Sequence, residues 1–148
     1  RAADDPLVAE AARLGVALHR GSEHDVLRRY AEAARATGAA VIVRVTGDVD
    51  SASADALRDS LRMARRSALH HPARLLVVDL EGVTYFGSAA LNAMLDCRDE
   101  ADAQGISVKL VAAQPSVTRP MAVTKLDEVL TLYPTLATAL RRDGSAPP

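Results

Sequence analysis

Two apolar, β-branched runs with a helix pattern between them constrain the fold of this chain more than any other feature. Residues 41–45 (Val-Ile-Val-Arg-Val) and 75–80 (Leu-Leu-Val-Val-Asp-Leu) are nearly continuous apolar segments, which is typical of strands buried on both faces. The segment between them repeats apolar residues at helical spacing: Ala54, Leu57, Leu61, Ala64 and Ala68. A strand, a helix and a strand in this order predict a right-handed crossover between parallel strands.

The alternation continues toward the C-terminus. We predict that Gly47-Asp48 turns the chain after the first strand, and that Gly87-Ser88 leads into a helix that Gly105 ends. Residues 107–112 predict a strand whose face with Lys109 is the more exposed one. A helix that begins late because of Pro120, a short strand at 129–132 and a last helix from Pro134 follow. The fold class is therefore predicted as α/β, a mixed and mostly parallel sheet flanked by helices.

The first part of the chain has a different pattern. Asp5-Pro6 and Ser22 are both typical helix starts, which predicts an N-terminal helical extension over residues 1–29. The main domain is predicted over residues 30–142, and residues 143–148 are predicted to form a flexible tail. Residues 30–36 fit either a helix or the first arm of a hairpin that turns at Thr37-Gly38.

Charge balance and cysteine content exclude several classes of function. Lys and Arg total 18 against 19 for Asp and Glu, a formal net charge of -1, so the chain lacks the basic excess typical of nucleic-acid or membrane binding. The single cysteine, Cys97, excludes an intramolecular disulfide and a cysteine-based zinc cluster, and it fits the reducing cytosol. The apolar runs are shorter than the roughly 20 residues of a membrane span. We therefore expect a cytoplasmic protein with neither nucleic acid nor membrane as partner.

None of the common catalytic or metal-binding motifs is present. Gly87-Ser88-Ala89-Ala90 lacks the final glycine of a nucleophile elbow, and there is no glycine-rich dinucleotide or phosphate loop. His70-His71 is expected to interact with a helix C-terminus, and neither this pair nor the other two histidines, His19 and His24, has metal-ligand spacing. We interpret Cys97 as a packed thiol rather than a redox sensor. The prediction is a protein that is not an enzyme and that has no catalytic residue, metal or cofactor.

Ser88 is the most informative residue. It follows a buried strand and a short apolar turn, and it lies where the next helix begins, so its hydroxyl can simply cap that helix. The carboxyl end of a parallel strand is also where α/β folds present functional groups, and a helix N-terminus there tolerates a phosphate. Asp48 and Asp50 follow the preceding strand. They are either turn and capping residues or an acidic loop beside Ser88.

Three segments of the chain resemble STAS domains, in the same order and spacing. Gly47-Asp48-Val49-Asp50, followed by Ser53-Ala54 and Leu57, is similar to their Gly-Glu-hydrophobic-Asp…Ser/Thr-Ala…Leu segment. Residues 79–95 are similar to their phosphorylation segment, and residues 124–129 to their signature near the last strand. The resemblance covers about residues 30–140. Three positions depart from the family pattern: Gly87 replaces an aspartate, Ala89 a serine or threonine, and Ala90 a glycine.

The resemblance implies an anti-sigma factor antagonist. Such a protein binds an anti-sigma factor that is a serine kinase and thereby releases a sigma factor, while phosphorylation of one serine disables the antagonist and a serine phosphatase restores it. The matching serine is Ser88, which is then a substrate side chain, with ATP bound by the partner. The implied partner-binding residues are Asp48, Asp50, Ser53, Gly87, Ser88, Ala89 and Asn92.

Two alternatives remain open. A STAS interaction module in a scaffold or sensor complex would use the same face without phosphorylation, and Ser88→Asp would then leave binding unchanged. A small hydrolase or transferase would use Ser88 as a nucleophile, but the sequence offers no plausible histidine partner for it.

Overall fold

The computed structural model describes Val16–Ala17 and residues 41–140 of the chain. Its strands form one sheet in the order β1-β2-β3-β4-β5, in which every neighbouring pair is parallel. The strands are β1 (Val16–Ala17), β2 (Val41–Val49), β3 (Leu75–Phe86), β4 (Ser107–Val111) and β5 (Leu132–Tyr133). The helices are α3 (Ala54–Leu69), α4 (Ser88–Ala103), α5 (Pro115–Val123), the short 3-10 helix η1 (Leu126–Glu128) and α6 (Leu136–Ala139). The predicted α/β class is confirmed.

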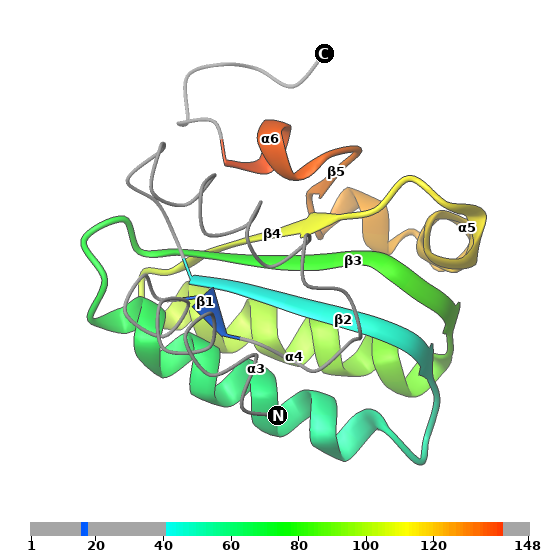
Figure 1. The fold of residues 1–148 in the computed structure, drawn as a ribbon, viewed down its shortest axis with the longest axis horizontal. Coiled ribbons are helices and arrows are strands. Elements are labelled where there is room, and N and C mark those ends of the chain that lie inside the picture. Colours follow the sequence, from blue (N-terminus) through cyan, green and yellow to red (C-terminus); the bar gives the residue numbers. More distant parts are fainter. Residues whose placement is uncertain (1–15, 18–40, 141–148) are drawn as a thin grey trace, which may run out of the picture.

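The main core lies between the sheet and the pair α3 and α4, which cover the same face of it (Figure 1). The two central strands are buried on both faces, as their continuous apolar runs predict, and Val43, Val77 and Val78 are fully buried. α3 turns the predicted stripe toward the core: Ala54, Leu57, Leu61, Ala64 and Ala68. α6 lies on the other side of the sheet (Figure 1).

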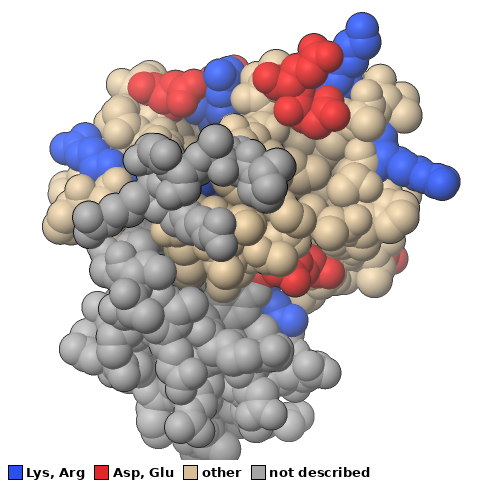
Figure 2. All heavy atoms as spheres, turned by 90° about the horizontal axis from the view of Figure 1, so that it is seen from above, with Lys and Arg blue, Asp and Glu red and all other residues tan. Residues whose placement is uncertain are grey.

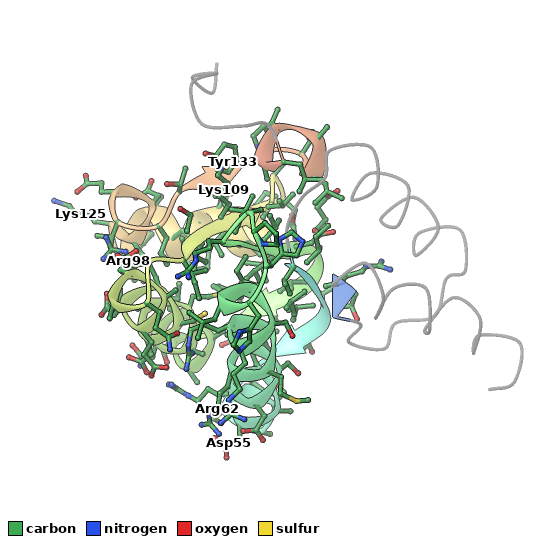
Figure 3. All side chains as sticks on the ribbon, turned by 90° about the vertical axis from the view of Figure 1, so that its left-hand side faces the viewer. Asp55, Arg62, Arg98, Lys109, Lys125 and Tyr133 are labelled. Carbon is green, nitrogen blue, oxygen red and sulfur yellow. The ribbon has the colours of Figure 1, made fainter. Side chains whose placement is uncertain are left out.

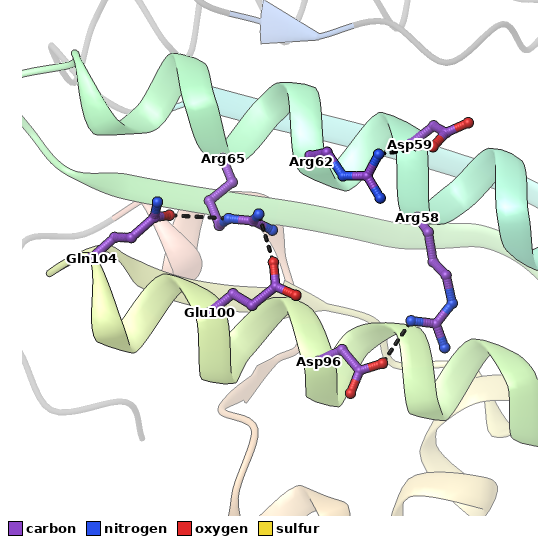
Figure 4. A network of polar contacts seen from close by, with 7 residues as sticks. All are labelled: Arg58, Asp59, Arg62, Arg65, Asp96, Glu100 and Gln104. Carbon is purple, nitrogen blue, oxygen red and sulfur yellow. Dashed lines mark hydrogen bonds and ion pairs between the residues drawn. The ribbon is translucent and has the colours of Figure 1, made fainter.

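Ion pairs connect α3 to α4 along their outer edge (Figure 4). Arg58 Nη1 lies 2.6 Å from Asp96 Oδ2, and Arg65 contacts both Glu100 and Gln104. Exposed pairs of this kind contribute little individually, about 0–1 kcal/mol. The pairs therefore link α3 to α4 along this edge, while the packing of both helices on the core holds them in place.

The predicted turn at Gly47-Asp48 is wrong. β2 continues to Val49, and Gly47 adopts a φ of +81° at a point where the register with β3 shifts. This conformation is open to glycine, so the residue that suggested a turn makes a β-bulge instead. β3 likewise continues through the predicted apolar turn to Phe86. Both strands therefore extend past the last β3–β4 pair, which joins Asp79 to Val111.

Three local predictions near the C-terminus are also wrong. Pro115 opens α5 and Pro120 lies inside it, so the helix does not begin late. Pro120 has no N–H, and one carbonyl of the preceding turn therefore lacks its usual donor. The strand predicted at 129–132 is shorter and later, because η1 occupies the preceding residues. Lys109 is buried rather than exposed, since Tyr133 on the edge strand covers it with its ring centroid 5.2 Å from Nζ (Figure 3).

The predicted helical extension contains an element that helix patterns did not indicate. Val16 and Ala17 pair with Ile42 and Val43 as strand β1, so these two residues belong to the sheet. An edge strand of two residues is too short for any periodicity to reveal it. The other residues of 1–29, residues 30–36, the tail at 143–148, and His19 and His24 lie outside the described residues. The domain boundaries stay predictions.

Candidate partner-binding site

The ends of β2 and β3 lie side by side, at the edge of the sheet where α3 and α4 begin (Figure 1). Val49 is the register partner of Phe86, and the Gly87 N–H donates to the Val49 carbonyl at 3.0 Å. Asp50 and Ser88 are the residues that follow these bonded positions. The structure thus brings the predicted acidic loop to the predicted phosphorylation segment.

The acidic loop is a turn that its own side chains stabilise through hydrogen bonds. Asp50 Oδ1 accepts hydrogen bonds from the N–H groups of Ala52 and Ser53 at 2.9 and 3.1 Å. Ser53 Oγ accepts from the Asp50 N–H at 3.0 Å and donates to the Asp48 carbonyl at 3.1 Å. Asp50 and Ser53 therefore build the turn that precedes α3, as the turn interpretation holds. The Ser53 side chain caps no N–H of the helix, so the capping part is wrong, and Asp50 stays exposed. The turn and the acidic-loop interpretations of Asp50 both fit this geometry.

Asp48 connects the two strands. Its Oδ1 accepts a 2.6 Å hydrogen bond from Thr84 Oγ1 across the β2–β3 pair. Both side chains are exposed, and the bond fixes the Asp48 carboxylate beside the end of β3.

The hydroxyl of Ser88 is bonded to none of the described residues. Gly87, not Ser88, is the N-cap of α4, so the interpretation of Ser88 as a capping residue is wrong. Ser88 is the first helical residue and is exposed, and its side chain makes no hydrogen bond within the described residues. Ala90 and Leu91 make the first bonds to the Gly87 carbonyl, which leaves the N–H groups of Ser88 and Ala89 outside the helical ladder.

The remaining predicted site residues lie on the same helix start. Asn92 is exposed one turn after Ser88 and therefore lies on the same face of α4. Ala89 and Gly87 are half-buried beside Ser88. All seven predicted partner-binding residues are thus at one end of the sheet.

Gln114 supports this end of the sheet, and sequence reasoning missed it. Its Nε2 donates to the carbonyls of Leu80 and Val83 at 2.6 and 3.1 Å, and Ser116 Oγ donates to Val83 at 2.9 Å. β4 no longer pairs with β3 there, so these side chains replace a neighbouring strand. A glutamine before a helix start carries no signal of such a long-range contact.

Asp79 is a second residue that the patterns did not single out for its chemistry. It is fully buried in β3, where Oδ1 accepts from the Glu81 N–H at 2.9 Å and Oδ2 has no partner among the described residues. Burial raises the pKa of this carboxyl to about 6.

Cys97 is buried in α4, which agrees with its interpretation as a packed thiol. Burial raises the pKa of this thiol to about 11, although the nearby Arg65 guanidinium opposes that shift.

We therefore expect the Cys97 thiol to react with an aromatic disulfide reagent more than about 100-fold more slowly in the native protein than in denaturant at pH ~8, because the thiolate is scarce and shielded. The release of thiolate, followed by absorbance, measures both rates. Equal rates in the two states would contradict the buried position.

The described residues meet the requirements of neither a metal site nor a membrane-spanning helix. They hold no group of three His, Cys, Asp or Glu side chains placed around a metal position. His71 Nδ1 accepts from the Ala73 N–H at 3.1 Å and shapes the turn after α3. Over the same residues, no helix combines the length and the apolar character needed to cross a membrane. Basic and acidic side chains are interspersed on the face that Figure 2 shows.

A comparison with protein-family models decides the family. The model described as the STAS domain matches residues 30–139. The chain belongs to the STAS-domain family. The resemblance of its three segments to this family is thereby confirmed.

The relatives of this STAS protein carry consistent names. A Mycobacterium tuberculosis protein that bears the name of an anti-anti-sigma factor is 30% identical over 127 residues, which cover 86% of this chain and 82% of the relative. The anti-sigma-F factor antagonist RsfA of M. tuberculosis is 28% identical over 101 residues, which cover 68% of this chain and 77% of the relative.

Solved structures agree on the fold. The crystal structure of an anti-sigma factor antagonist from Mycobacterium paratuberculosis has a TM-score of 0.60 at 30% identity and covers 67% of this chain and 80% of its own. A Thermotoga maritima structure has a TM-score of 0.59 at 18% identity, covers 67% of this chain and 82% of its own, and supports the STAS fold alone.

Proposed function

We propose that this protein is an anti-sigma factor antagonist, which binds an anti-sigma factor through the surface at the ends of β2 and β3 and so releases a sigma factor. The observation that carries the proposal is the exposed Ser88 hydroxyl, which no described side chain or backbone group uses, at the start of α4 beside Asp50. The names of the relatives support the same role. We expect it to act in the cytoplasm.

The proposal extends to regulation at Ser88. A serine kinase in the anti-sigma factor would transfer a phosphoryl group to Ser88 Oγ, and a serine phosphatase would remove it; ATP would be bound by the partner and Ser88 would be the substrate. Phosphorylation adds nearly two negative charges. These charges would lie beside Asp48 and Asp50 and would face the nucleotide phosphates of the bound kinase, so repulsion weakens the complex.

Binding of the purified anti-sigma factor tests both parts. The partner is first captured from lysate of the native host, identified by mass spectrometry and purified, and its Kd is measured by calorimetry. Ser88→Asp is expected to weaken binding by at least about 10-fold, which is about 1.4 kcal/mol. Ser88→Ala is expected to bind like the wild type and to accept no phosphate from ATP.

Ser107→Asp is the matched control, because Ser107 is exposed at the start of β4, at the other end of the sheet. It is expected to bind like the wild type. Recovery of no anti-sigma factor would contradict the antagonist role.

A STAS interaction module without a phosphate switch is the second candidate. The departures at Gly87, Ala89 and Ala90 favour it, because these positions flank the proposed phosphorylation site. In that case wild type and Ser88→Asp would bind the partner equally, and ATP would leave no phosphate on the protein.

A further inference from the structure

Tyr85 places an exposed aromatic ring beside Gly87, the residue that precedes Ser88. Its side chain belongs to β3, three residues before Ser88, and the residue is 54% exposed. Its register partner on β2 is Asp48, so the ring lies over the proposed partner surface. Among the described residues, the other exposed large apolar side chains lie elsewhere, on α3, at the end of α5 and after η1: Met63, Val123 and Val129.

The Tyr85 ring lies close to the backbone of Gly87. A Cβ atom built on Gly87 would lie 3.0 Å from Tyr85 Cε2 and 3.3 Å from the Tyr85 hydroxyl oxygen. The first distance is too short for an unshifted contact, so the ring packs against the bare backbone of residue 87. A half-exposed ring that is already held in place loses little conformational entropy on binding, which is the property of an interface anchor.

The chain segments that end β2 and β3 and begin α3 and α4 carry acidic charges only. Residues 45–57 and 81–95, which form both strand ends and both helix starts, contain Asp48, Asp50, Asp55 and Glu81 but no Lys, Arg or His. An arginine of a partner can contact both the exposed ring and the acidic side chains, because its planar guanidinium stacks on an aromatic face and donates to neighbouring carboxylates.

We infer that Tyr85 is the anchor of this surface and receives an arginine side chain of the anti-sigma factor, while Gly87 keeps the ring in place. The inference rests on the proposed function, since it names the contact through which that partner is held. The phosphoryl group on Ser88 acts at a separate point, against the nucleotide of the kinase.

The test measures the Kd of the purified anti-sigma factor for four variants of the proposed contact and one control variant. Tyr85→Ala and Tyr85→Leu are both expected to weaken binding by about 30-fold, whereas Tyr85→Phe stays within about 3-fold of the wild type, because a cation binds the ring face and not an aliphatic side chain. Gly87→Ala is expected to weaken binding by about 10-fold, since its Cβ displaces the ring. Met63→Ala, which removes an even more exposed apolar side chain from α3, is expected to have no effect.

The outcomes separate the inference from the proposed function. Thermal unfolding first verifies that each variant is folded. If the wild type binds and Tyr85→Ala binds equally well, the inference is overturned but the proposed function is not. The same holds if Tyr85→Leu binds as tightly as the wild type, because the contact is then apolar. Failure of the wild type to bind any anti-sigma factor overturns both. The arginine contact is supported if Tyr85→Ala and Tyr85→Leu lose affinity while Tyr85→Phe keeps it. The affinity of Tyr85→Leu should also depend less on salt concentration than that of the wild type.

Discussion

Replacement of Gln114 by glutamate is expected to lower the free energy of unfolding by about 2–3 kcal/mol at neutral pH. The wild-type Nε2 donates to the Leu80 and Val83 carbonyls, in a stretch of β3 that β4 does not reach. A carboxylate offers only acceptors there and would repel both carbonyl oxygens. Protonation of the glutamate restores one donor, so the loss should shrink in acid.

Urea unfolding at several pH values measures this effect, and Gln104→Glu is its matched control. Gln104 Oε1 only accepts a hydrogen bond from Arg65 Nε at 3.0 Å, which a glutamate oxygen can replace. The control is therefore expected to change stability by less than about 0.5 kcal/mol. Faster hydrogen exchange at Phe86 and Leu91 in Gln114→Glu would locate the loss at the partner surface. If the two variants lost equal stability, Gln114 would not support β3.

The sequence predicts those parts of this fold in which one periodicity dominates a whole element. The stripe from Ala54 to Ala68 determines α3, and the two continuous apolar runs determine the central strands, because burial on both faces demands such composition. The meeting of Asp50 and Ser88 also follows, since parallel strands end at one edge of a sheet.

The rest depends on contacts between distant segments. Gly47 has the same local signature in a turn and in a β-bulge, and only the pairing with β3 selects the bulge. Lys109 is polar and was expected on an exposed face, but Tyr133 covers it from the edge strand. The hydrogen bonds of Gln114 join residues more than 30 positions apart. No local pattern encodes these contacts, so the residues that support the candidate site escaped prediction.

Asp79 is expected to make the stability of this protein decrease as the pH rises from about 4 to about 6. Its pKa is about 6 in the fold and 3.8 in the unfolded chain, so the native state holds the proton more tightly over that interval. Stability is then greatest below the unfolded pKa, falls through the interval and is constant above it. The full shift corresponds to about 3 kcal/mol.

Asp79→Asn should therefore be about 1–2 kcal/mol more stable than the wild type at neutral pH and should gain nothing below pH ~4. The asparagine Oδ1 keeps the bond from the Glu81 N–H, while Nδ2 inherits the position of the unpartnered Oδ2, which limits the gain. Urea unfolding between these pH values, taken as the difference from wild type, isolates this one group. Asp59→Asn, which removes an exposed carboxylate whose ion-pair partner among the described residues is Arg62 on α3, should give a flat difference. A pH-independent difference for Asp79→Asn would show that the buried carboxyl is ionised throughout, and that it is stabilised by charges or donors other than the Glu81 N–H.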